Sequence, residues 1–351
     1  MTHVLAGDVG GTRARFALFD ANGKKVVFQD VLESRTFPTF EKALATFFEG
    51  EVRKHLKGKR PIAAATFGIA GPVVGHRVHT TNLPWVIDAN VIAKEFAIPK
   101  VTLLNDLVAV GLGAIASPPS KLAVVHKGRP KKEGGNLAVI AAGTGLGEAA
   151  FVWDGEKHVA SATEGAHVDF APRTPVEAQL LAELTTEYGH VSYERVASGS
   201  TLLRLYRFFV RDIRESKEAA AFVARAEDAN VAVVDLAEKG TSEAAMRALE
   251  LWCSVYGAEA GNLALKTLAT GGVFVAGGVS ARLAPILAHG LPARKKKVSP
   301  FVEAFVDKGR MRQLLEKIPV VVALEPRAGI LGSAAHAAKM ATRPAGRSRK
   351  A

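Results

Sequence analysis

Two glycine-rich turns in this sequence have the composition of phosphate-binding loops. The first consists of Gly7, Asp8, Val9, Gly10, Gly11 and Thr12. Apolar residues at 4–6 precede it and the alternating run 14–19 follows it, which predicts a strand, a tight turn and a second strand. Adjacent glycines let the backbone approach a ligand closely, with its N–H groups directed at an anion. An ordinary hairpin with a Gly-Gly turn is the alternative for this motif alone.

The second turn repeats the first in the middle of the chain. It consists of Gly143, Thr144, Gly145, Leu146 and Gly147, and it follows the apolar run 139–142. Another apolar run, 149–153, comes after it, so the pattern again predicts strand, turn and strand. This repetition indicates two related halves, each of which presents a phosphate-binding hairpin to a shared cleft.

Asp8 distinguishes the first turn from the second. A carboxylate just before the turn could help to hold the Mg²⁺ of a bound nucleotide, directly or through water. The second copy has Ala142 at the corresponding place. We therefore expect only the first half to supply a carboxylate beside the metal.

Asp106 is the candidate catalytic base. It lies between a predicted strand, 100–104, and a predicted helix, 107–115, where side chains face the ligand-binding crevice of open α/β sheets. Phosphoryl transfer needs a donor held by backbone amides and metal, and one base that takes the proton of the acceptor hydroxyl. The alternative is that Asp106 is only an N-cap, which stabilises a helix by about 1 kcal/mol.

A polar cluster at 164–170 combines carboxylates and an imidazole with glycine. Its ionisable members are Glu164, His167 and Asp169. No cysteine lies near, and the spacing matches no structural zinc site. The cluster suits a polyol, because a buried carboxylate discriminates strongly for a hydroxyl that can pair with it. A polar loop without a ligand is the alternative.

The composition is that of a globular protein with two domains. The chain has 351 residues, of which 48% are hydrophobic and 23% charged. No apolar run approaches the ~18–20 residues of a membrane span, and the N-terminus lacks a signal-peptide pattern. A single cysteine, Cys253, cannot form an internal disulfide and fits a reducing cytoplasm. Its helical surroundings predict a buried, inert thiol.

The formal net charge of +12 is concentrated in three segments, 121–132, 294–297 and 342–351. The last is rich in Arg, Ser, Gly and Pro and is predicted to be a disordered tail. A basic excess can favour nucleic acid, or it can attract anionic substrates and aid solubility. Because the sequence has no DNA-reading motif and no interleaving of basic and aromatic residues, the second interpretation is favoured.

The predicted elements place these motifs in an α/β protein with mixed sheets. The first half has predicted strands at 25–32, 61–67 and 100–104 and predicted helices at 40–48 and 107–115. The second has predicted helices at 177–187, 201–211 and 242–268 and predicted strands at 271–280 and 320–324. Residues 118–119 and 127–135 are predicted to be a linker and a mobile loop. Ser280 is the expected N-cap of the next helix, and a last helix, 328–340, is expected to pack on the first domain.

Five motifs in order resemble the bacterial glucokinase family, which has the actin-like ATPase and sugar kinase fold. They are the two glycine turns, Leu104-Asn105-Asp106, the segment 164–172 and the segment His190-Val191-Ser192-Tyr193-Glu194-Arg195-Val196. Any one glycine motif is a weak signal, whereas five in sequence are highly specific. The match runs from Gly7 to His336 and leaves out the basic tail.

The resemblance implies a role for each matching residue. ATP phosphates would be held by residues 7–12, with Asp8 near Mg²⁺, and by Gly143, Thr144 and Gly145 of the other domain. Gly277 and Gly278 would border the adenosine. The hexose would be bound by Asn82, Asn105, Asp106, Glu164, His167 and Glu194.

The resemblance also implies the reaction and the domain organisation. Asp106 would deprotonate the 6-hydroxyl of D-glucose, and ATP would yield ADP and glucose 6-phosphate, the entry step of glycolysis. A small domain, 1–117, completed by the helix 327–341, and a large domain, 118–326, would close on the substrates and exclude water. The family is typically a cytoplasmic homodimer.

Three departures from the family pattern leave the hexose open. Arg13 stands in place of a usual Asn, Ala166 in place of a usual Gly, and Ser200-Thr201 in place of a usual Pro-Gly. We expect the last two to touch the sugar loops. Mannose or an amino sugar, and ADP or polyphosphate as donor, are alternatives. A sugar-sensing regulator is a further one, although the chain leaves no room for a DNA-reading segment before the first strand.

Overall fold

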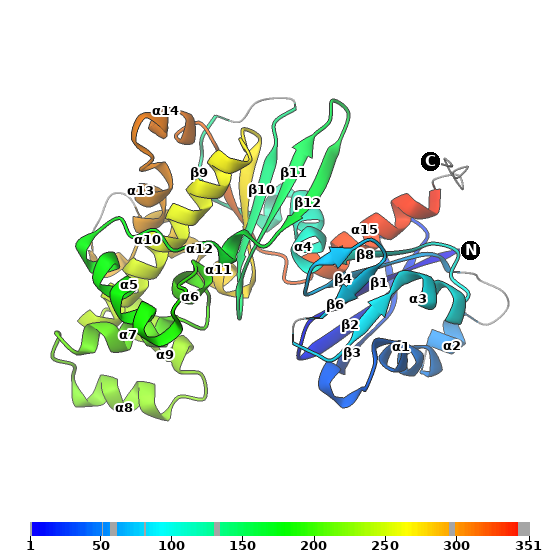
Figure 1. Cartoon of the computed structure of the whole chain (residues 1–351), viewed down its shortest axis with the longest axis horizontal. Helices are drawn as coiled ribbons and strands as arrows, with labels where there is room; N and C mark the ends of the chain where they lie inside the picture. The colour runs from blue at the N-terminus through cyan, green and yellow to red at the C-terminus, as the bar shows by residue number, and fades with distance from the viewer. Residues whose placement is uncertain are drawn as a thin grey trace. The chain divides into compact units, whose positions relative to one another are not determined.

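The computed structural model describes residues 2–50, 52–56, 62–80, 82–129, 134–294 and 299–342. The chain forms two compact units (Figure 1). Unit 1 comprises the described residues up to Pro118 together with those from Glu325 onward, and unit 2 runs from Pro119 to Leu324. The predicted tail from 343 onward lies outside the described residues, as do 130–133 and 295–298 of the two other basic segments.

Unit 1 is built on a five-stranded mixed sheet. Its strands, in spatial order, are β3 (Val26–Glu33), β2 (Arg13–Asp20), β1 (His3–Val9), β4 (Ile62–Ile69) and β8 (Val101–Asn105). β1, β4 and β8 are parallel, and the register pairs Val9 with Ile69 and Ile69 with Asn105. The carboxyl ends of these strands therefore lie in one line, and the segments that follow them emerge at the same edge.

Three helices pack on one face of this sheet, and the core between them and the sheet is rich in aromatic residues. The helices are α1 (Phe40–Glu49), α2 (Val52–His55) and α3 (Ala89–Glu95). Phe16, Phe40 and Phe67 meet edge to face with ring centroids 5.1, 5.7 and 6.2 Å apart. The Thr39 hydroxyl caps α1 by accepting a hydrogen bond from Lys42 N. The sequence predicted α1 but not α3.

Two helices, α4 (Asp106–Ile115) and α15 (Ala328–Thr342), cover the other face (Figure 1). α15 packs Ile330 and Ala334 against β1 and β2, which confirms the prediction for the last helix. α4 and α15 lie backbone to backbone. A Cβ at Gly332 would be 1.9 Å from the carbonyl oxygen of Ala109, and a Cβ at Gly113 would be 2.0 Å from that of Ala328.

A small three-stranded sheet follows β4. It consists of β5 (Val73–Val74), β6 (Arg77–His79) and β7 (Val86–Asp88). The turn between β6 and β7 is closed by Thr80, whose N–H donates to Trp85 O at 3.1 Å and whose hydroxyl donates to Leu83 O at 2.8 Å. This turn presents Asn82.

Unit 2 has a six-stranded mixed sheet that repeats the topology of unit 1. Its strands, in spatial order, are β12 (His158–Thr163), β11 (Leu146–Trp153), β10 (Leu137–Ala142), β13 (Gly272–Ala276), β14 (Val320–Ala323) and β9 (Leu122–His126). β10 pairs antiparallel with β11 and parallel with β13, as β1 does with β2 and β4. The predicted repeat is thus confirmed in the topology. β9 was not predicted, and it adds an edge strand to this sheet.

Helices surround α10, which is buried along most of its length. The helices of unit 2 are α5 (Pro175–Tyr188), α6 (Glu194–Ala197), α7 (Leu202–Val210), α8 (Lys217–Arg225), α9 (Ala229–Lys239), α10 (Glu243–Lys266), α11 (Gly278–Arg282), α12 (Ala284–His289), α13 (Pro300–Val306) and α14 (Arg312–Leu315). Five 3-10 turns, η1 (Ser34–Thr36), η2 (Pro119–Lys121), η3 (Gly165–His167), η4 (Pro292–Arg294) and η5 (Gly309–Met311), complete the described chain.

Two predictions about single residues of unit 2 have different outcomes. Cys253 is fully buried on α10, and burial raises the pKa of its thiol, as expected for an inert cysteine. The prediction that Ser280 is an N-cap is wrong. α11 begins at Gly278 with Gly277 as its cap, and Ser280 is buried inside the helix.

Within the described residues, no helix has both the length and the apolar character that crossing a membrane requires.

Candidate active site

The first glycine turn joins β1 and β2 at the common strand edge of unit 1. Gly10 N donates to Arg13 O at 3.0 Å, and the Ser34 hydroxyl donates to Gly10 O at 2.9 Å, so neighbouring groups fix the turn. Gly11 lies directly on the predicted sugar residue Asn82, because a Cβ at Gly11 would be 2.7 Å from the Asn82 Cβ. The structure thus brings a predicted phosphate-binding turn and a predicted hexose ligand into contact.

Asp8 lies near the end of β1, opposite Arg15 in the β1–β2 register. Arg15 Nη1 is 3.4 Å from Asp8 Oδ2, and a Cβ at Gly329 of α15 would be 3.1 Å from Asp8 Cγ. Burial raises the pKa of Asp8, and the charge of Arg15 opposes this shift. Arg15 and Gly329 were not predicted as part of the site; the register opposite Asp8 is the signal that would have identified Arg15.

A Mg²⁺ ion at Asp8 would have few protein ligands. Within the described part of the chain, no group of three or more His, Cys, Asp and Glu side chains could hold a metal by itself. Mg²⁺ is commonly bound by one or two carboxylates and by substrate phosphates. A single carboxylate beside a phosphate-binding turn fits that pattern.

Asn105 and Asp106 end β8 and begin α4 at the same edge. Asn105 is the N-cap: its Oδ1 accepts from Leu107 N at 2.9 Å, and its Nδ2 donates to Gly71 O at 3.3 Å. Asp106 is the first residue of the helix, and its Oδ1 also accepts from Leu107 N at 2.9 Å. Because Asn105 takes the capping position, the interpretation of Asp106 as the N-cap is wrong.

In unit 2, hydrogen bonds within the second glycine turn and from residues 199–200 fix its conformation. Gly143 N donates to Gly145 O at 2.8 Å, and Gly199 N donates to Gly143 O at 2.8 Å. The Ser200 hydroxyl donates to Thr144 O at 2.9 Å. The turn's carbonyl groups therefore point at protein donors, an arrangement that suits a turn whose amides bind an anion.

Gly277 and Gly278 lie beside this turn because β13 runs parallel to β10. Gly277 has a φ of +91°, and a Cβ there would be 2.5 Å from the carbonyl oxygen of Ala142, so only glycine allows this approach. The Tyr256 hydroxyl joins the two segments by accepting from Ala142 N at 3.2 Å and lying 3.0 Å from the Ser280 hydroxyl. The predicted adenosine and phosphate residues of unit 2 are thus neighbours.

The three predicted hexose residues of unit 2 also come together. His167 Nε2 is 4.0 Å from Glu164 Oε2, and His167 Nδ1 is 4.0 Å from Glu194 Oε1. Glu194 reaches the second glycine turn as well, because its Oε2 accepts from Leu146 N at 2.9 Å. A Cβ at Gly145 would be 2.4 Å from the same oxygen. One carboxylate thus contacts both parts of the predicted site in this unit.

The departures from the family pattern have separate positions. Arg13 is exposed at the start of β2, and Ala166 is buried within η3. Ser200 contacts the phosphate turn, and the buried Thr201 hydroxyl donates to Val196 O and Ser198 O. Ser200 also lies 3.0 Å from the Ser198 hydroxyl, and Thr201 reaches Val196 of the segment 190–196. The expectation that Ser200-Thr201 touches the sugar loops stays a prediction.

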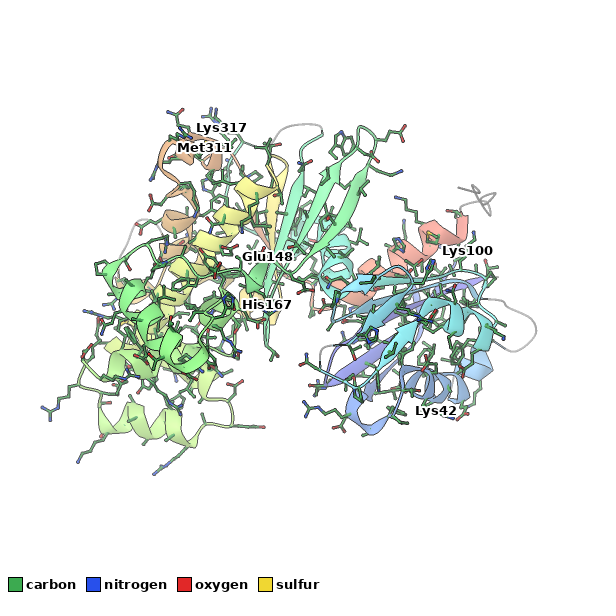
Figure 2. The ribbon with its side chains drawn as sticks, in the orientation of Figure 1. Lys42, Lys100, Glu148, His167, Met311 and Lys317 are labelled. Atoms are coloured by element: carbon green, nitrogen blue, oxygen red, sulfur yellow. The ribbon has the colours of Figure 1, made fainter. Side chains whose placement is uncertain are left out.

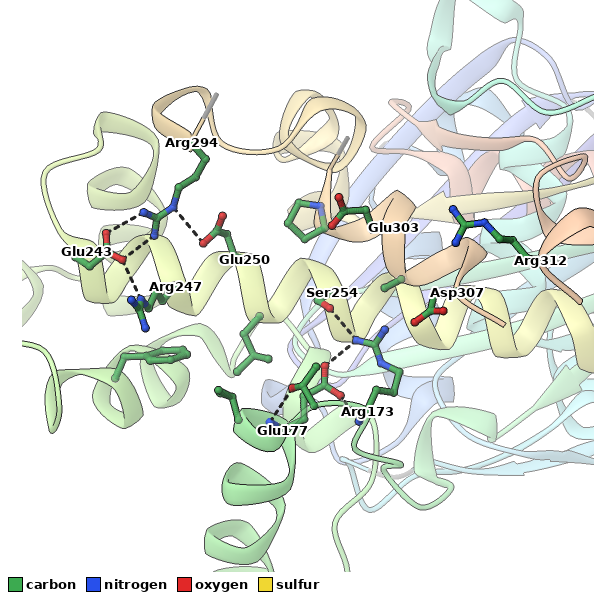
Figure 3. A pocket seen from close by; sticks show the side chains of 16 residues that line it. Arg173, Glu177, Glu243, Arg247, Glu250, Ser254, Arg294, Glu303, Asp307 and Arg312 are labelled. Atoms are coloured by element: carbon green, nitrogen blue, oxygen red, sulfur yellow. Dashed lines mark hydrogen bonds and ion pairs between the residues drawn. The ribbon is translucent and has the colours of Figure 1, made fainter. Parts of the chain in front are cut away.

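A cavity of about 790 Å³ in unit 2 lies apart from these residues (Figure 3). Its arginines are matched by carboxylates: Arg173 bonds Glu177 at 2.7 Å, and Arg294 bonds Glu243 at 2.9 Å. Among the described residues that line it, none belongs to the predicted site. The candidate active site is therefore formed by the strand ends, not by this cavity.

Sequence reasoning also missed two buried acids, Glu148 of β11 and Glu259 of α10 (Figure 2 labels Glu148). Each is a single charge among apolar neighbours in the sequence, and that isolation is the signal that would have identified them.

Comparison with known proteins agrees with this geometry. A family model described as Glucokinase matches residues 5–340. The glucokinase of Synechocystis sp. is 37% identical over 358 aligned residues, which cover 95% of this chain and 98% of that protein. The crystal structure of glucokinase from an Antarctic psychrotroph is 30% identical with a TM-score of 0.75, and the match covers 97% of this chain and 99% of that one.

A more distant solved structure shares the fold. A ROK family glucokinase from Streptomyces griseus, in complex with glucose and AMPPNP, matches at 18% identity with a TM-score of 0.62 and covers 96% of this chain and 99% of that one. The family model and the Synechocystis protein each match nearly the whole chain. This chain therefore belongs to the glucokinase family.

Proposed function

We propose that this protein is a glucokinase that transfers the γ-phosphoryl group of ATP to the 6-hydroxyl of D-glucose. The observation that carries the proposal is the position of Asp106 at the carboxyl end of β8, in line with the glycine turn that follows β1. That edge of an open α/β sheet is where ligands bind. Membership of the glucokinase family supports glucose as the acceptor and ATP as the donor.

Asp106 is the proposed general base. Its carboxylate takes the proton of the glucose 6-hydroxyl as O6 forms a bond to the γ-phosphorus, and the bond from that phosphorus to the β–γ bridging oxygen breaks to release ADP. Asn82, Asn105, Glu164, His167 and Glu194 are the proposed ligands of the sugar hydroxyls. Their amide, carboxylate and imidazole groups can pair with hydroxyls as donors or acceptors.

The two glycine turns are the proposed phosphate ligands. Gly7 to Thr12 and Gly143 to Gly145 would surround the phosphates, and Gly277 and Gly278 would border the adenosine. Asp8 would hold Mg²⁺, which supplies charge neutralisation for the phosphates when it is bound. In the proposed two-domain actin-like ATPase fold, domain closure excludes water that would otherwise hydrolyse ATP.

A coupled assay with purified protein, glucose, ATP and Mg²⁺ tests this proposal. Glucose 6-phosphate is the expected product, and its absence would refute the proposed activity. Ala166 replaces a usual Gly in the predicted sugar loop, which leaves the choice of hexose open. The same assay with mannose and glucosamine therefore tests another hexose or amino sugar as the acceptor. ADP and polyphosphate in place of ATP test the donor. Light scattering coupled to gel filtration tests the predicted homodimer.

A further inference from the structure

Two buried carboxyl groups lie beneath the loop that carries Glu164 and His167. Glu148 of β11 is 1% exposed, and Glu259 of α10 is 0% exposed. The two side chains lie within hydrogen-bonding range of each other, and this contact helps to raise the pKa of Glu148. An ionised carboxylate only accepts hydrogen bonds, so this contact requires a proton on one of the two groups.

The partners of the two groups indicate which one is ionised. Glu259 Oε2 accepts from Asn262 Nδ2 at 2.8 Å, and Glu259 Oε1 lies 3.3 Å from Lys266 Nζ, so Glu259 has the partners of a carboxylate. Glu148 Oε1 has no hydrogen-bond partner among the described residues. Leaving an oxygen unpaired costs less for a neutral acid than for a carboxylate. Burial and the charge of Glu259 raise the pKa of Glu148 to about 8.

Glu148 also contacts the backbone of the loop. A Cβ at Gly165 would lie 2.2 Å from Glu148 Oε2, so the carboxyl group and the loop touch with no space for a side chain between them. The β11–β12 register places Thr163 opposite Glu148, and Gly165 N donates to the Thr163 hydroxyl at 2.8 Å. Gly165 begins η3, which ends at His167. Glu148 thus supports this loop from inside unit 2.

Other titratable groups face the pair from neighbouring elements. Burial raises the pKa of Tyr193 and of Tyr256, which keeps both hydroxyls neutral below pH 10. Lys266 faces Glu259 from α10. Lys308 interacts with Glu259 and with Arg173, Glu177 and Asp307, and burial lowers its pKa to about 8. Lys308 is therefore the group whose titration must be separated from that of Glu148.

We propose that Glu148 and Glu259 share one proton at neutral pH and that the neutral Glu148 carboxyl group holds the hexose-binding loop in place. The inference rests on the proposed roles of Glu164 and His167. Loss of the proton leaves two carboxylates in contact inside the protein, and their repulsion, together with the burial of a second charge, displaces Glu148 from the loop. The pair is a positioning device that makes hexose affinity depend on pH.

The shared proton is tested without any assay of activity. Glu148→Gln keeps the shape of the side chain and is neutral at every pH. Between pH 4.5, its ordinary pKa, and about 8, folded wild-type protein binds a proton at Glu148 that the unfolded chain has lost, so its stability falls as pH rises. We expect the Tm of the wild type to fall relative to that of Glu148→Gln up to pH 8 and then to run parallel. Parallel curves throughout would overturn the shared proton.

The positioning role is tested by the pH profile of the Michaelis constant. Because the protonated fraction falls about tenfold for each pH unit above the pKa, the wild-type KM for glucose should rise about tenfold from pH 7 to pH 9, with kcat retained. In Glu148→Gln the KM for glucose at pH 9 should stay within about twofold of its value at pH 7. Lys308→Met is the matched control, since Lys308 has the same pKa, and it should keep the wild-type rise. A rise that persists in Glu148→Gln and is lost in Lys308→Met would overturn the proposal.

Hydrogen exchange separates failure of this inference from failure of the proposed function. If the wild type phosphorylates no hexose, the proposed function is wrong, and the amides of residues 164–168 still report on the loop. After correction for intrinsic rates, their protection should drop between pH 7 and pH 9 in the wild type and not in Glu148→Gln. Equal protection in both proteins at both pH values would refute the positioning role.

Discussion

The carboxylate of Glu194 accepts a hydrogen bond from the backbone N–H of Leu146 at 2.9 Å. Leu146 belongs to the second glycine turn, and the other oxygen of Glu194 lies 4.0 Å from His167 Nδ1. A proposed hexose ligand therefore also shapes the proposed phosphate turn. The consequence is that damage at Glu194 should affect both substrates.

Glu194→Ala is expected to raise the KM for glucose and the KM for ATP together. Hydrogen bonds to a charged group contribute about 1.5–3 kcal/mol, which corresponds to roughly 10- to 150-fold in affinity for the sugar. Glu194→Gln keeps an oxygen that can accept from Leu146 N, so it should spare the KM for ATP. Steady-state kinetics with each substrate varied checks both variants. An unchanged KM for ATP in Glu194→Ala would contradict the shared role.

Asp106→Asn is expected to abolish turnover and to leave glucose binding largely intact. The amide has the same shape but cannot take the proton of the 6-hydroxyl, and a general base contributes about 10²–10⁴-fold to the rate. Initial rates measure the loss, and titration calorimetry with glucose measures the binding. Full activity of this variant would remove Asp106 from the role of base.

Tyr256→Phe is expected to lower stability and to weaken ATP binding. The variant leaves the buried Ala142 N–H without its acceptor, which costs about 1–3 kcal/mol. It also releases the ends of β10 and α11 from each other, beside the predicted phosphate and adenosine residues. Ser280→Ala serves as the matched control, because Ala142 N keeps its acceptor there and the effect should be smaller. Denaturant unfolding and the KM for ATP measure the two effects; equal values for both variants would argue against the role of the tyrosine hydroxyl.

Gly332→Ala is expected to destabilise unit 1. The added methyl group would lie 1.9 Å from the carbonyl oxygen of Ala109, so α4 and α15 must move apart, and overpacking of this kind costs about 1–3 kcal/mol or more. Gly50→Ala is the control, because its nearest neighbour is 3.6 Å away and its φ of −74° suits alanine. Thermal unfolding compares the two variants. A Gly332→Ala protein as stable as the control would show that the two helices can separate freely.

The strands and the glycine turns could be predicted because their signals are local. Alternating apolar residues beside adjacent glycines specify a hairpin whatever surrounds it, and the structure has both predicted hairpins. The convergence of Glu164, His167 and Glu194 could be anticipated only from the resemblance to a family, since nothing in their spacing brings 164 and 194 together.

The predictions that were wrong or missing concern residues whose structure depends on a neighbour in space that is distant in sequence. Ser280 has the composition of an N-cap, but Tyr256 of α10 holds its hydroxyl inside the protein. Asn105 and Asp106 are equally good caps in sequence, and the hydrogen bond from Asn105 to Gly71 O favours Asn105. β9 is a short apolar run between basic and proline-rich segments, and it becomes a strand because β14 offers an edge.

The position of α15 in the chain has a consequence for biosynthesis. The β1 surface on which α15 packs is translated before all of Pro119–Leu324, whereas unit 2 is one continuous segment. At about 5–20 residues per second, the ribosome needs on the order of ten seconds or more to add that segment. Unit 2 can therefore finish folding first, while the part of the sheet face that α15 covers waits for its helix.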